Sequence, residues 1–144
     1  MPRAGLIALA LLTATPAAAH WEYTRWGMTE AAVIAASRGA VRALPAGERR
    51  RQGDLDYRAA GRFEAEGARF RVVFGFARAG LRCISIRAQD PRQAPAMRRW
   101  FTRGFGPPQQ VGGDEEQSVL AWSRPDSIEM LVQPGAAIAL HCAP

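Results

Sequence analysis

The chain has 144 residues, which is enough for one domain with a sizeable core. All 19 basic residues are arginine, and with 13 acidic residues the formal net charge is +6. A basic surface favours anionic partners, such as phospholipid headgroups, lipopolysaccharide, acidic polymers or acidic proteins.

Residues 1–19 have the pattern of a cleaved signal peptide. Arg3 is the basic start, residues 5–14 are an apolar run too short to span a bilayer, and Ala17, Ala18 and Ala19 form the cleavage site. We therefore expect residues 20–144 to be a single domain, periplasmic or secreted, with no transmembrane segment in the mature chain. Nucleic acid is not an expected partner of such a protein.

The first predicted element of the mature chain is a helix over residues 30–38. Thr29 has the hydroxyl that an N-cap needs. Met28 and Val33 have the spacing of a hydrophobic staple, and Gly39 is a typical helix stop.

The rest of the chain repeats one order of elements. A polar loop over 40–54 is followed by three predicted strands, a helix that Asp90 and Pro91 begin, a loop over 107–116, and three more strands. The order predicts pseudo-repeats over about 26–88 and 90–143, and an α+β fold of two αβββ halves whose antiparallel sheet has the helices packed on one face. The predicted strands are 55–63, 70–76, 81–88, 118–123, 127–133 and 136–142.

The stretch Gly27-Met28-Thr29, with Val33 following, resembles the first-helix entrance of the SmpA/OmlA (BamE-like) envelope proteins and of the β-lactamase-inhibitor-protein-like modules. Phe105-Gly106-Pro107, followed by Trp122, is similar to a second motif of these modules. The resemblance implies a small envelope module in which a helix packs on an antiparallel sheet. The chain lacks a lipid-anchor cysteine near the cleavage site, so the resemblance does not extend to a lipid anchor.

The two cysteines, Cys83 and Cys142, predict one disulfide, because an exported chain folds in an oxidising compartment. The alternative is a catalytic thiol, but the chain has no Cys-x-x-Cys motif.

An enzyme is the main alternative to a binding protein. Cleavage after Ala19 would make His20 the N-terminal residue, and a copper site could use it together with His141. The chain has no catalytic triad pattern, phosphate loop or dinucleotide motif. The prediction is therefore a non-enzymatic protein with no cofactor.

The arginine groups are the best candidates for partner binding, because guanidinium groups bind phosphate and carboxylate in a forked geometry. The alternative is that they form a solvated surface. We predict an envelope binding or scaffold module for a protein or an anionic lipid or polymer. The candidate residues are Arg49, Arg50 and Arg51 in the first loop and Arg98, Arg99 and Arg103 in the second helix.

Overall fold

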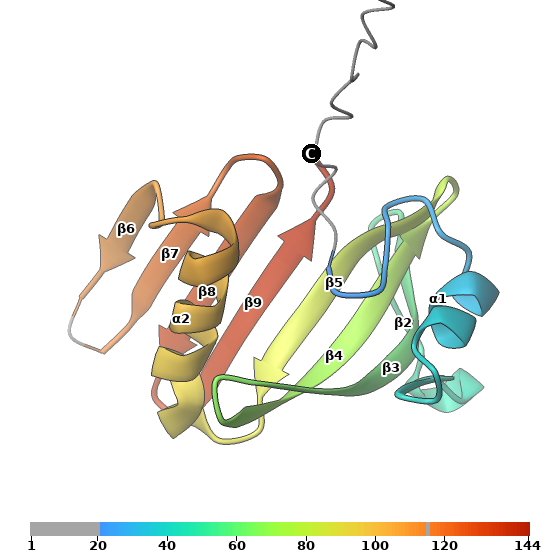
Figure 1. Cartoon of the computed structure of the whole chain (residues 1–144), viewed down its shortest axis with the longest axis horizontal. Coiled ribbons are helices and arrows are strands. Elements are labelled where there is room, and N and C mark those ends of the chain that lie inside the picture. Colours follow the sequence, from blue (N-terminus) through green and yellow to red (C-terminus); the bar gives the residue numbers. More distant parts are fainter. Residues whose placement is uncertain (1–20, 115) are drawn as a thin grey trace, which may run out of the picture.

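The computed structural model describes residues 21–114 and 116–144. They form one nine-stranded antiparallel sheet with two α-helices and two short 3-10 helices. Figure 1 shows α2 lying across one end of the sheet and α1 beside the other end. In chain order the elements are α1 (Glu30–Ala36), β1 (Val41–Ala43), η1 (Ala46–Glu48), β2 (Arg50–Gln52), β3 (Leu55–Ala65), β4 (Ala68–Ala77), β5 (Gly80–Ala88), η2 (Pro91–Gln93), α2 (Ala94–Phe105), β6 (Gln110–Gly113), β7 (Ser118–Trp122), β8 (Ser127–Gln133) and β9 (Ala136–Cys142).

The predicted fold class of two αβββ halves is wrong, because the chain is richer in strands than that. The strand order is β1-β3-β4-β5-β9-β8-β7-β6, and β2 also pairs with β3. The strands β1, β2 and β6 lie in the segments 40–54 and 107–116, which were predicted as loops. Each is only three or four residues long and pairs along an outer edge of β3 or β7. Such short segments have no periodicity of their own, so the neighbouring strand makes them strands.

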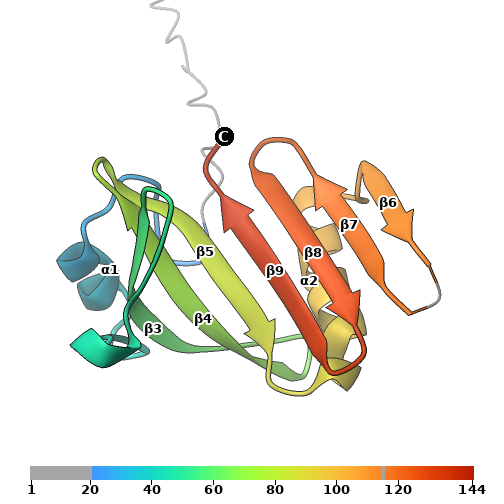
Figure 2. The same ribbon diagram turned by 180° about the vertical axis from the view of Figure 1, so that it is seen from behind.

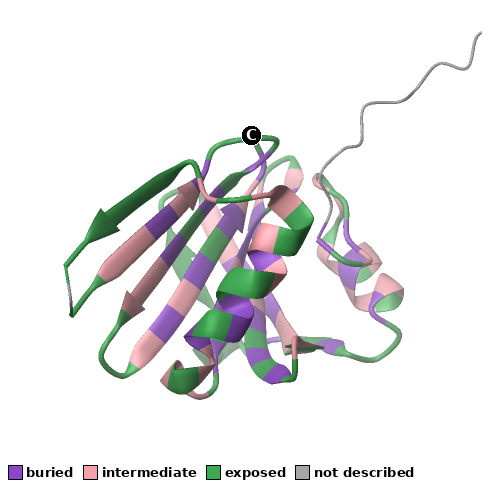
Figure 3. Ribbon diagram, turned by 60° about the vertical axis from the view of Figure 1, so that its left-hand side comes forward, coloured by how far each residue is buried: buried purple, intermediate pink, exposed green. Residues whose placement is uncertain are grey.

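The long strands alternate between buried and exposed residues, as their period-two patterns predict (Figure 3). In β4, Phe70, Val72 and Phe74 are buried, whereas Arg69 and Arg71 are exposed. The buried residues of all the long strands join one core with the apolar side of α2. The side chains on the other face of the sheet are therefore available to solvent or to a ligand.

The first helix begins where the sequence predicts. The Thr29 hydroxyl accepts a hydrogen bond from the backbone N–H of Ala32 at 3.2 Å, and Val33 is buried. The helix ends at Ala36, two residues before the predicted end, and Gly39 follows with a φ of +93°.

The second helix begins with a tighter turn than predicted. Asp90 accepts a hydrogen bond from the backbone N–H of Arg92 at 2.9 Å, but this cap opens the 3-10 helix η2. The α-helix α2 follows directly and buries Met97 and Phe101 against the sheet.

The predicted disulfide is confirmed. Cys83 in β5 and Cys142 in β9 lie directly opposite each other with Cα atoms 4.1 Å apart. The pairing is possible because β5 and β9 are neighbours in the middle of the sheet. No helix in residues 21–114 and 116–144 is long and apolar enough to cross a membrane.

Candidate anion-binding groove

The sheet has one covered face and one open face. The covered face carries Phe74, Met130 and His141 toward α2, and the open face carries Arg71 and Leu140. The segment 44–52, which contains η1 and β2, folds over one end of the open face. We call this segment the flap, and Figure 2 shows it in front of the sheet with α2 behind.

Three arginines form a row across the open face. Arg62 in β3 lies directly opposite Arg71 in β4, and Arg71 lies directly opposite Arg87 in β5. Side chains in such positions have Cβ atoms about 4.5–5.5 Å apart, and like charges there are destabilising. We call Arg62, Arg71 and Arg87 the arginine row.

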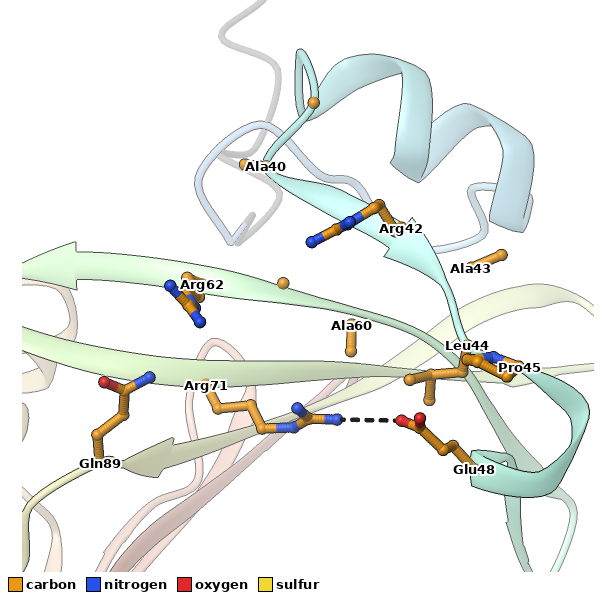
Figure 4. Close-up of a pocket in the computed structure, with 12 residues that line it drawn as sticks. Ala40, Arg42, Ala43, Leu44, Pro45, Glu48, Ala60, Arg62, Arg71 and Gln89 are labelled. Atoms are coloured by element: carbon orange, nitrogen blue, oxygen red, sulfur yellow. Dashed lines mark ion pairs between the residues drawn. The ribbon is translucent and has the colours of Figure 1, made fainter.

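A pocket of about 730 Å³ lies beside this row. Arg42 from β1 lines it with Arg62 and Arg71, and Figure 4 shows these side chains around it. Ala60 and Gly61 of β3 also line the pocket, and they leave room for a ligand because alanine has only a methyl group and glycine has no side chain. The remaining lining residues are Gly39, Ala40, Ala43, Leu44, Pro45, Glu48 and Gln89.

The charges around the pocket are unbalanced. Glu48 on the flap is the only carboxylate among the described residues that line the pocket, and its Oε2 lies 4.0 Å from Nη2 of Arg71 (Figure 4). Both side chains are more than half exposed, so this ion pair contributes at most about 1 kcal/mol. Within the described part of the chain, Arg42, Arg62 and Arg87 have no ion-pair partner. Their guanidinium groups are therefore available to an anion.

The first group of predicted arginines belongs to the flap. Arg49 donates from Nε to the carbonyl of Leu44 at 3.0 Å, and Arg50 donates to the carbonyl of Gly47 at 3.0 Å. These bonds hold the flap in shape. Arg51 is exposed on β2.

The second group lies on the opposite side of the sheet, so the structure does not bring the two groups together. Arg99 and Arg103 both pair with Glu66, at 3.7 Å and 2.7 Å, and so join α2 to the turn between β3 and β4. Arg98 is exposed on α2.

Of the two histidines in the alternative copper site, only His141 belongs to the described residues. His20 lies outside the described residues. His141 is fully buried, and its Nε2 lies 2.6 Å from Oδ2 of Asp126. In the described ranges, no group of three or more His, Cys, Asp or Glu side chains is placed to hold a metal.

The arginine row was not predicted from the sequence, although the sequence contains a signal for part of it. A turn at Glu66-Gly67 between two antiparallel strands places Arg62 opposite Arg71, since both are the same distance from the turn. The place of Arg42 could not be predicted from the sequence, because β1 has no strand pattern.

No protein-family model, curated protein or solved structure matches this chain.

Proposed function

We propose that this chain is an exported, non-enzymatic binding module that holds an anionic group of an envelope component in the pocket beside the arginine row. The row carries the proposal, because Arg62 and Arg71 are like charges on directly opposite positions, and both line the pocket together with Arg42. An anion among them removes the repulsion and accepts charge-assisted hydrogen bonds. The net charge supports it by attracting anions over a longer range, since residues 20–144 keep 18 of the 19 arginines against 13 acidic residues.

The chemistry of the pocket supports binding rather than catalysis. Among the described residues, its lining contains arginine, glutamate and glutamine but no serine, cysteine or histidine. The described lining of the pocket therefore offers charge and shape without a hydroxyl, thiol or imidazole group, and its carboxylate, Glu48, is paired with Arg71.

Export rests on two independent observations. The disulfide between Cys83 and Cys142 is typical of an oxidising compartment, and residues 1–19 have the composition of a signal peptide. The resemblance to envelope modules points to the same compartment, the periplasm or the exterior of the cell. That resemblance stays a prediction.

The first test is an NMR titration of the isotope-labelled, disulfide-bonded protein with methyl phosphate. We expect saturable shifts at β1, β3 and β4, and we expect Arg62→Glu to abolish them because it places a negative charge in the row. Raising the salt concentration from about 0.1 M to about 1 M should weaken binding, since the screening length falls from about 10 Å to about 3 Å.

Arg98→Glu is the matched control. It makes the same charge change on α2, on the other side of the sheet, and should leave the titration unchanged. An equal loss in both variants would mean that only the net charge matters, and the proposed site would be wrong.

A further inference from the structure

A second pocket, of about 450 Å³, adjoins the cationic one on the open face. Val73, Ser85 and Leu140 line it from three neighbouring strands, because Val73 pairs with Ser85 and Ser85 pairs with Leu140. Ile138 lies two residues from Leu140 on the same strand and face. The other lining residues are Leu44, Glu48, Arg50, Gln52, Tyr57 and Arg71.

The sheet side of this second pocket is more apolar than a solvated face requires. The solvent-facing positions of an antiparallel sheet are normally polar. Here Val73, Ile138 and Leu140 occupy such positions, and Leu140 is 37% exposed. The flap stands over them without filling the space, since the pocket remains. Apolar surface left in a concave site favours an apolar ligand group.

The two pockets form one groove. Leu44, Glu48 and Arg71 line both of them. The groove is therefore cationic at the end near Arg42 and Arg62, and apolar at the end near Leu140. Both volumes lie within the roughly 300–1,000 Å³ typical of small-molecule sites.

We infer that the groove binds a single-chain anionic amphiphile, an alkyl chain that carries a phosphate headgroup. The headgroup lies among Arg42, Arg62 and Arg71, and the chain lies on Val73, Ile138 and Leu140 under the flap. The flap bounds the apolar end on one side, and the pocket there has a volume of about 450 Å³. This inference rests on the proposed function, because the headgroup uses the same arginines.

The test compares methyl phosphate with octyl phosphate, which share a headgroup and differ in chain length. Isothermal titration of the disulfide-bonded protein, below the concentration at which octyl phosphate forms micelles, gives both affinities. We expect octyl phosphate to bind more tightly, by about fourfold for each methylene that is fully buried. Arg62→Glu should lower the affinity for both ligands.

Substitutions of the sheet residues at the apolar end of the groove test where the alkyl chain of the ligand lies. Leu140→Ser and Ile138→Ser should each lower the affinity for octyl phosphate severalfold and leave methyl phosphate unchanged. Val111→Ser is the matched control, because Val111 is an exposed apolar residue on β6, far along the sheet from the groove. Thermal melting confirms that each variant is folded before it is titrated.

The outcomes separate this inference from the proposed function. Equal affinities for the two phosphates would overturn the inference of an amphiphilic ligand and leave the proposed anion binding intact. If neither phosphate binds, both the inference and the proposed function are wrong. If octyl phosphate binds equally well to Leu140→Ser and Ile138→Ser, its alkyl chain lies elsewhere and the inference is wrong. A dimer in sedimentation velocity that Leu140→Ser dissociates would show that a second copy covers the groove, and would also overturn the amphiphile.

Discussion

His141 is the most enclosed polar side chain in the described structure. Its Nε2 lies 2.6 Å from Oδ2 of Asp126, which also accepts a hydrogen bond from Nε1 of Trp26 at 3.3 Å. The rings of Trp26 and Phe105 each stand 5.1 Å from the imidazole, edge to face. Burial lowers the pKa of His141 below 6.5, and the hydrogen bond to Asp126 only partly opposes that shift. The folded protein therefore holds His141 in its neutral form down to a lower pH than the unfolded chain does.

The lowered pKa makes stability depend on pH. Below about pH 6.5 an unfolded chain protonates this histidine while the folded chain resists, so the free energy of unfolding should fall as the pH drops toward the folded pKa. Asp126 is the one titratable group in contact with the ring in the described part of the chain. Urea unfolding between about pH 8 and about pH 5 measures the slope.

His141→Gln is the comparison, because glutamine retains a donor for Asp126 and does not titrate. The variant should be less stable at neutral pH but show a flatter pH dependence over the same range. If both proteins lose stability in parallel on acidification, other groups cause the effect.

Among the elements, β1 depends on a close approach to β3. Gly61 pairs with Val41, and a Cβ on Gly61 would lie 2.4 Å from the carbonyl oxygen of Ala40. Since that atom is backbone, no side chain can move aside to admit the methyl group. The glycine is therefore required for β1 to pair with β3 and to bring Arg42 beside Arg62.

Gly61→Ala should separate β1 from β3 and lower the free energy of unfolding by about 1–3 kcal/mol, the usual cost of overpacking. Anion binding should weaken with it, because Arg42 moves. Gly112→Ala in β6 is the matched control, since a Cβ there meets open space, and its effect should stay within about 1 kcal/mol. Equal chemical-denaturation curves for the two variants would contradict this account of the contact.

Over the whole molecule, the disulfide joins the two parts of the sheet at its centre. β3, β4 and β5 lie on one side of the Cys83–Cys142 bond, and β9, β8 and β7 lie on the other. The segment before α1 also connects the parts, because Trp21 is buried against Phe74 of β4 and Trp100 of α2. The sheet is therefore expected to unfold as one unit.

Replacing both cysteines by serine should lower the free energy of unfolding by about 4 kcal/mol, because the bond closes a loop with a sequence separation of 59. Guanidinium unfolding of the variant and of the oxidised protein measures the difference. A variant as stable as the oxidised protein would show that the bond does not constrain the unfolded chain.

Local patterns predicted much of the fold. The strand β4 was evident because Phe70, Val72 and Phe74 alternate with polar or smaller residues, and the N-cap at Thr29 needs only atoms one turn away. The disulfide between the two cysteines was predicted from the expected export to an oxidising compartment. What failed was the balance of helix and strand, since β1, β2 and β6 are strands only by virtue of β3 and β7.

The sequence by itself determined the long strands, the helix starts and the disulfide, because each depends on periodicity, on neighbouring residues or on redox environment. Only the tertiary structure decided where the charges meet. Arg42, Arg62 and Arg87 come from three separate strands, and His141 and Asp126 from a strand and a turn 15 residues apart. Such contacts depend on strand order and on the folding of the flap over the sheet, which are set by packing of the whole chain rather than by any one segment.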